Sequence, residues 1–170
     1  MATSFSTSRA SSTFPVYSAP GGNGLVQCAY GSVTFDGDVT LAAALTVSMC
    51  KLPKNATVLG GHVMGADIDT GTEAFDFDIG WVSASAPTCP PGTTLNATDT
   101  DGFGNLGVQS GDAITELKPV AGIYVPLQGV LFDSGPLTFA DGATVTLIFN
   151  ADANAGGTGT VSIVVFYTTP

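Results

Sequence analysis

Apolar and polar residues alternate along much of this chain, and a period of two predicts half-buried β-strands. The clearest case is 74–83, where one face holds Phe75, Phe77, Ile79 and Trp81 and the other holds Asp76, Asp78 and Gly80. A second strand is predicted over 142–150, with Ala143, Val145, Leu147 and Phe149 facing inward.

The segment 158–168 predicts a strand whose two faces are both largely apolar. Its inward set is Val161, Ile163, Val165 and Tyr167, and its other face holds Ser162, Val164 and Phe166. Such a strand is expected in the centre of a sheet or under a partner. Val164 and Phe166 are therefore predicted to belong to a partner interface.

Shorter patterns predict further strands at 25–35, 39–50, 56–66, 122–126 and 129–132. Asp36-Gly37-Asp38 predicts a hairpin between the first two of these strands. Only 112–117 resembles a helical turn, and the Pro-, Gly-, Thr- and Asn-rich stretch 86–111 predicts a long surface loop. About eight short strands at this spacing favour an all-β fold, an antiparallel β-sandwich that is jelly-roll-like.

The predicted domain organisation is a flexible arm followed by one domain. Residues 1–23 form an extended N-terminal arm rich in Ser, Thr and Gly, and 24–170 form the β-sandwich domain, with its long loop at about 86–111. Phe14, Val16 and Tyr17 are the large side chains by which the arm would attach to a neighbouring subunit. These three residues are the second part of the predicted partner interface.

Charge narrows the classes of partner. The chain has 4 basic and 14 acidic residues among 170, a net charge of -10. So few cations cannot neutralise a row of phosphates or an anionic lipid surface, so we expect no nucleic acid and no membrane as partner.

Cys28, Cys50 and Cys89 are widely spaced and odd in number. Because 1–23 has neither the basic start nor the apolar stretch of an export signal, we expect synthesis in a cytoplasm and reduced thiols. One disulfide is left open as an alternative.

Candidate chemistry is sparse, and we predict no catalytic, cofactor-binding or metal site. His62 is the single histidine, with no G-x-S-x-G motif to accompany it. Asp76 and Asp78 would lie on the wet face of one strand, where a small hydrolase pair is the alternative. Gly102–Gly107 spells G-x-G-x-x-G without the strand and helix that the dinucleotide motif needs. The stretches 67–73 and 99–105 depart from the calcium-loop pattern, but calcium binding is left open.

The stretch 56–80 carries a resemblance. A strand ending in Asp67-x-Asp69-Thr-Gly-Thr, followed by a strand ending in Asp78-Ile-Gly80, resembles small virion structural proteins of tailed bacteriophages. The later segments 122–127, 144–149 and 159–167 fit the same pattern. The arm 1–23 is where the chain departs from it.

This resemblance implies a capsid decoration (cement) protein, a jelly-roll-like sandwich on the outer surface of an icosahedral head. It implies the major capsid protein as partner, a homo-oligomer with a trimer favoured, and no enzymatic activity. The alternatives are another virion component, such as a head-fibre base or tail-associated protein, and a calcium-assisted carbohydrate-binding β-sandwich.

Overall fold

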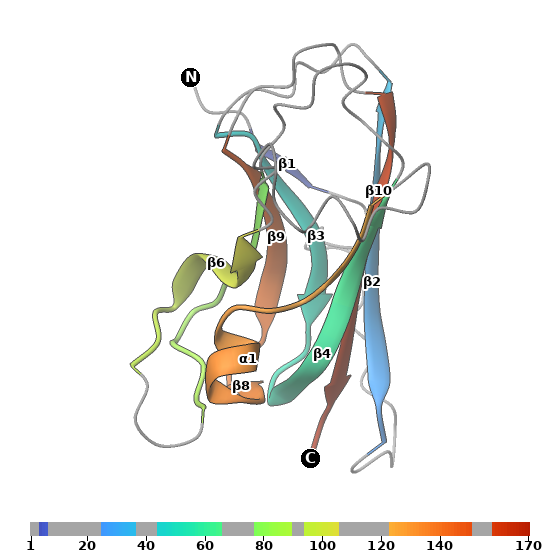
Figure 1. Ribbon diagram of the computed structural model, residues 1–170. Helices are drawn as coiled ribbons and strands as arrows, with labels where there is room; N and C mark the ends of the chain where they lie inside the picture. Colours follow the sequence, from blue (N-terminus) through green and yellow to red (C-terminus); the bar gives the residue numbers. More distant parts are fainter. Residues whose placement is uncertain are drawn as a thin grey trace.

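The computed structural model describes residues 4–6, 25–36, 44–65, 77–89, 94–105, 123–150 and 158–170. These residues form ten strands and one short helix, in two packed sheets (Figure 1). In chain order they are β1 (Ser4–Ser6), β2 (Gln27–Asp36), β3 (Thr46–Leu52), β4 (Ala56–Gly65), β5 (Phe77–Val82), β6 (Thr98–Asn105), β7 (Ile123–Pro126), α1 (Val130–Ser134), β8 (Leu137–Phe139), β9 (Ala143–Phe149) and β10 (Thr158–Thr168).

One sheet has the order β1-β3-β9-β5-β6 and the other β2-β10-β4-β7, with β8 added beside β4. Leaving out β1 and β8, the eight remaining strands pair from the outside inward: first with last, second with seventh, third with sixth, fourth with fifth. These pairs are β2–β10, β3–β9, β4–β7 and β5–β6, all antiparallel. The additional pairs β10–β4 and β9–β5 fold this nested hairpin into two sheets. This is the jelly-roll arrangement, so the predicted fold class is confirmed.

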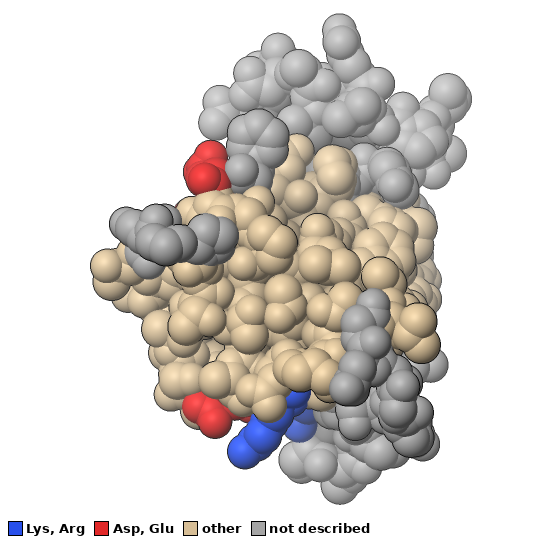
Figure 2. Space-filling view, turned by 90° about the horizontal axis from the view of Figure 1, so that it is seen from below, with Lys and Arg blue, Asp and Glu red and all other residues tan. Residues whose placement is uncertain are grey.

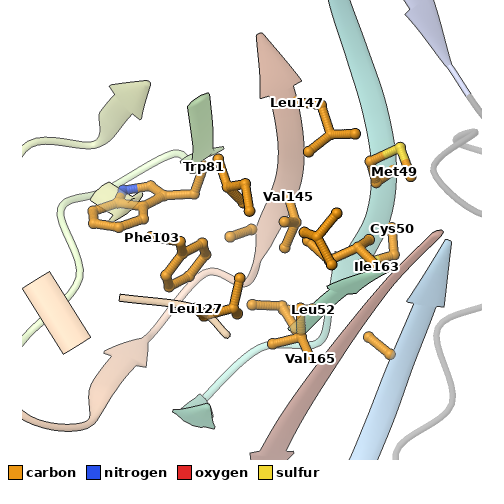
Figure 3. Close-up of a cluster of buried hydrophobic side chains, with 14 of the residues drawn as sticks. Met49, Cys50, Leu52, Trp81, Phe103, Leu127, Val145, Leu147, Ile163 and Val165 are labelled. Carbon is orange, nitrogen blue, oxygen red and sulfur yellow. The ribbon is translucent and has the colours of Figure 1, made fainter. Parts of the chain in front are cut away.

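The core lies between the sheets and is built from the alternating inward positions of both. Figure 3 shows Trp81 and Phe103 packed on Leu127 and Val145, with Ile163 and Val165 contributed by the opposite sheet. Trp81 is fully buried; its ring centroid is 4.9 Å from that of Phe103 and 5.5 Å from that of Phe139. Its indole N–H donates to the carbonyl of Asn96, at 3.1 Å. The one polar atom of this large side chain is thereby satisfied in the interior.

Three strands predicted from alternation agree closely with the structure: β5, β9 and β10. The inward sets along β9 and β10 are buried as predicted, and β10 lies in the middle of its sheet between β2 and β4. Alternation succeeds here because one face of each strand is sealed against the other sheet.

The strand predicted over 129–132 is wrong, because the chain forms α1 there. Gly129 has a φ of 62°, and a Cβ on it would lie 2.7 Å from the carbonyl oxygen of Gly102. The chain turns at this glycine, and the amide of Asp133 then donates to the Gly129 carbonyl at 3.1 Å. Val130 and Leu131 are still packed against the core. A short apolar run satisfies either conformation, so its hydrophobicity alone did not distinguish them.

The hairpin predicted around 36–38 is also wrong, because β2 and β3 belong to different sheets. The segment 86–111 differs from a plain loop in the part that is described, since it contains β6. Phe103 is the reason: it is fully buried between Trp81 and Phe139, and this anchor holds β6 on the edge of its sheet.

Of the predicted arm, only β1 is described. Ser4–Ser6 pair in parallel with Thr46–Ser48 on β3. Phe14, Val16 and Tyr17 lie outside the described residues. Within the part of the chain that the structure describes, no helix is long and apolar enough to cross a membrane.

Candidate interaction surface

The outer face of the β2-β10-β4-β7 sheet is the most distinctive surface of the described molecule. We call it the β10 face, and it consists of Cys28, Tyr30, Ser32, His62, Met64, Ser162, Val164 and Phe166. Strand register places these side chains in rows across the sheet, because alternate residues of paired strands point to the same side. One row is Tyr30, Val164 and His62, and the next has Phe166 between Cys28 and Gly60.

Both interface residues predicted from this strand, Val164 and Phe166, therefore lie on one face. Val164 is half-buried, and 37% of Phe166 is exposed. The ring of His62 packs beside Phe166, with centroids 5.8 Å apart. Gly60, which pairs with Phe166 and lies on the same strand as His62, leaves open space where a Cβ would stand. The ring of Phe166 thus contacts His62 and stays partly exposed beside Gly60.

Tyr30 and Leu59 extend this apolar area. Tyr30 is 37% exposed and Leu59 46% exposed, and Leu59 is the extra residue of a β-bulge next to Gly60. Sequence reasoning did not select these two residues. Alternation alone places Tyr30 beside Cys28 and Ser32 on a common face, but the pairing of β2 with β10 is needed to set that face beside Phe166.

A short chain of hydroxyl groups borders the apolar part of the face. Ser162 Oγ donates to Ser32 Oγ at 3.0 Å, and Tyr30 Oη lies 3.2 Å from Ser162 Oγ. Since Ser162 has one hydroxyl proton, Tyr30 is the donor in the second bond. These bonds hold the Tyr30 ring in place on the sheet, which lowers the entropy it would lose on contact with a partner.

The β10 face is also uncharged. The segment 27–35 and the strands β4, β7 and β10 contain no Lys, Arg, Asp or Glu. Of the basic residues in the described part, Lys51 lies near the end of β3 and Lys54 in the turn between β3 and β4. Figure 2 shows the basic atoms gathered at one margin of an otherwise mostly uncharged end of the molecule. In a chain of net charge -10, an acid-free face is where association meets the least repulsion.

Asp78 does not lie on a wet face as the sequence analysis expected. It is only 7% exposed, and Asn150 Nδ2 donates to its Oδ2 at 2.7 Å. Asp76, its possible partner in a carboxylate pair, lies outside the described residues. Within the described part of the chain, no three His, Cys, Asp or Glu residues gather as a metal site would require.

Asp99 and Asp101, which the sequence analysis weighed as part of a calcium loop, lie along the edge strand β6. Partial burial, a side-chain hydrogen bond with Asp101 and repulsion from that carboxylate together raise the pKa of Asp99 above its ordinary value of 3.8. The stretch 67–73 lies outside the described residues. Cys28, Cys50 and Cys89 are thiols, exposed, buried and half-buried respectively.

The fold matches chains from two bacteriophage capsids. A chain from the capsid of Ralstonia phage GP4 superposes with a TM-score of 0.66 at 16% identity, over 98% of this chain and 98% of that one. A chain from the capsid asymmetric unit of cyanophage Pam1 superposes with a TM-score of 0.59 at 21% identity, over 94% of this chain and 95% of that one. No protein-family model matches the sequence, and no curated protein matches it. At these identities the likeness establishes a shared fold along nearly the whole chain.

Proposed function

We propose that this protein is a non-enzymatic structural component of a bacteriophage virion, a capsid decoration (cement) protein on the outer surface of an icosahedral head. The observation that carries the proposal is the likeness of fold, over almost the full length of each chain, to chains of two phage capsids. Because a fold hosts many functions, the proposal also needs a surface suited to assembly.

The β10 face supplies such a surface. Its exposed aromatic and aliphatic side chains, without formal charge, have the composition of an interface core rather than of open surface. We assign it to contact with the major capsid protein or with a neighbouring copy in a homotrimer. Val164 and Phe166 would be central in that contact, with Tyr30 as a preorganised aromatic anchor.

The net charge of -10 supports the outer side of the shell. A protein lining the interior would face densely packed phosphates, and its acidic groups would be repelled. Phe14, Val16 and Tyr17 remain the proposed anchors of the arm on a neighbouring subunit.

Sedimentation with capsids tests the proposal. Purified protein is mixed with expanded heads that lack it, and the pelleted fraction is measured. The wild-type protein should sediment with the heads, whereas Phe166→Ser should bind at least about tenfold more weakly, as expected for loss of an interface anchor. Val82→Ser is the matched control, because Val82 is 46% exposed on the opposite sheet. If the wild-type protein stays in solution, the decoration role is excluded; if it pellets with tails instead, it is a tail-associated component.

A carbohydrate-binding role is the second candidate, and one observation favours it: Tyr30 and Phe166 present two exposed rings beside a row of hydroxyl groups. Aromatic faces with nearby hydrogen-bonding groups are typical of sugar sites. A glycan array, probed with calcium and with chelator, separates the two functions. Binding to a defined glycan that Tyr30→Ala removes would favour the carbohydrate role.

A further inference from the structure

The free side of β3 accepts a strand that lies outside the jelly roll. The eight nested strands are complete without β1, which adds in parallel to the edge of β3 while all other paired strands are antiparallel. The register joins Ser4 to Thr46, Phe5 to Val47 and Ser6 to Ser48. An edge strand of this kind presents unpaired backbone groups that any suitably extended segment can use.

The length of the docking edge matches β1. Beyond Ser48, β2 comes against β3, since a Cβ on Gly31 would lie 2.2 Å from the Met49 carbonyl oxygen. The strand β1 runs toward this point and ends one position before it. The edge therefore offers a slot of three residues, Thr46–Ser48, bounded by β2.

The connection between β1 and β2 is long enough to reach beyond one molecule. Some 20 residues separate Ser6 from Gln27 and span up to roughly 65 Å when extended. A domain of this length has a radius of gyration of only about 15 Å. The same β1 can thus reach the β3 edge of its own copy or that of a neighbour, and the backbone pairing is identical in both cases.

We infer that the β3 edge at Thr46–Ser48 is a docking site for the Ser4–Ser6 segment of a second copy of this chain, so that neighbouring copies exchange their N-terminal strands. Every copy carries one strand and one slot, so exchange conserves the number of backbone hydrogen bonds while linking the copies. Exchange becomes favourable once copies are held near each other. The effective concentration of a neighbour's β3 edge around β1 then equals that of the β3 edge in the same copy. This inference concerns the chain itself and does not depend on binding to a capsid.

Variants with introduced cysteines test exchange between copies. In a background of Cys28→Ser and Cys89→Ser, with the buried Cys50 retained, one full-length copy carries Ser6→Cys and a tag, and a second copy carries Ser48→Cys. Each mixed pair is incubated at high protein concentration and oxidised, and the disulfide-linked product is measured on a non-reducing gel. A copy with Thr98→Cys, an exposed residue on the opposite edge strand β6, replaces the Ser48→Cys copy in the control.

Exchange predicts at least about tenfold more tagged dimer with Ser48→Cys than with Thr98→Cys. A chain carrying both Ser6→Cys and Ser48→Cys reports pairing within one molecule. If that chain closes only on itself and the mixed copies give no excess of dimer over the control, exchange is excluded. If neither arrangement cross-links, the assigned slot is wrong.

Discussion

At the scale of single residues, one glycine sets how closely the two sheets approach along one side of the sandwich. Gly31 on β2 brings its backbone against that of Met49 on β3, where no side chain atom would fit. The contact involves main-chain atoms on both strands, so neither partner can move away by changing rotamer. Tight packing of this kind transmits a small change in volume to the whole edge.

Gly31→Ala should therefore destabilise the protein by about 2–3 kcal/mol, because the new methyl group must push β2 away from β3. Thr34→Ala, further along β2 with an exposed hydroxyl bonded to Thr160, should change the free energy of unfolding by less than about 0.5 kcal/mol. Urea unfolding followed by tryptophan fluorescence measures both. Equal midpoints for the two variants would show that β2 shifts freely.

The carboxyl of Asp99 makes a second prediction at this scale, concerning pH. Its folded pKa is raised by burial and by Asp101, so the folded state holds this proton more tightly than the unfolded state does. The contribution of Asp99 to stability is therefore full below pH 3.8 and is lost as the pH rises through the folded pKa. The difference in free energy of unfolding between wild type and Asp99→Asn should change between pH 3.8 and the folded pKa of Asp99 and be constant above that pKa. A difference that stays constant over the whole acid range would contradict the assignment.

At the scale of elements, β10 organises its sheet because it is paired on both sides and buried on one. Ile163 is fully buried, while its neighbour Val164 faces outward. Adjacent residues of one strand thus serve two purposes: one face holds the sandwich together and the other is available for partners.

Ile163→Ala should cost about 3 kcal/mol through lost contacts and the cavity it leaves. Val164→Ala should cost about 1 kcal/mol or less, because its side chain is only half-buried on the outer face. Thermal and urea unfolding of both variants provide the measurement. A Val164→Ala variant as unstable as Ile163→Ala would mean that the outer face is needed for folding rather than for association.

The alternation of apolar and polar residues predicted the strands that bury one face against the other sheet. It failed where a backbone turn or a single buried side chain determines the structure. It located β5, β9 and β10 because their inward residues are uniformly apolar. It misassigned 129–132, where the backbone turn at Gly129 sets the conformation, and it gave no sign that Phe103 anchors a strand within a polar, glycine-rich stretch. Alternation also did not predict which strands pair. Asp36-Gly37-Asp38 resembles a hairpin turn, yet the strands on its two sides belong to different sheets.

At the scale of the whole molecule, the jelly-roll topology assembles the β10 face from strands that are distant in sequence. Val164 and Phe166 could be selected from their own strand, because an apolar second face is visible in the residues themselves. Tyr30, His62 and Leu59 join them only through the pairing of β10 with β2 and β4. None of the residues that make up the β10 face is Lys, Arg, Asp or Glu, and Asp36 stands at the far end of β2. The strand-docking edge of β3 lies on the other sheet. The proposed contact with a capsid and the proposed strand exchange between copies would therefore use two separate surfaces of one domain.

We therefore expect the arm to serve attachment and the domain to fold without it. Deleting residues 1–22 removes β1 together with Phe14, Val16 and Tyr17 but none of the eight nested strands. We expect the truncated protein to keep its β-sheet circular dichroism and its cooperative unfolding, and to sediment with expanded capsids at least about tenfold less well. Phe166→Ser in the full-length chain provides the comparison, because it alters the β10 face and leaves the arm intact. Attachment equal to that of the wild-type protein would assign all capsid contact to the domain, and loss of cooperative unfolding would make the arm part of the fold.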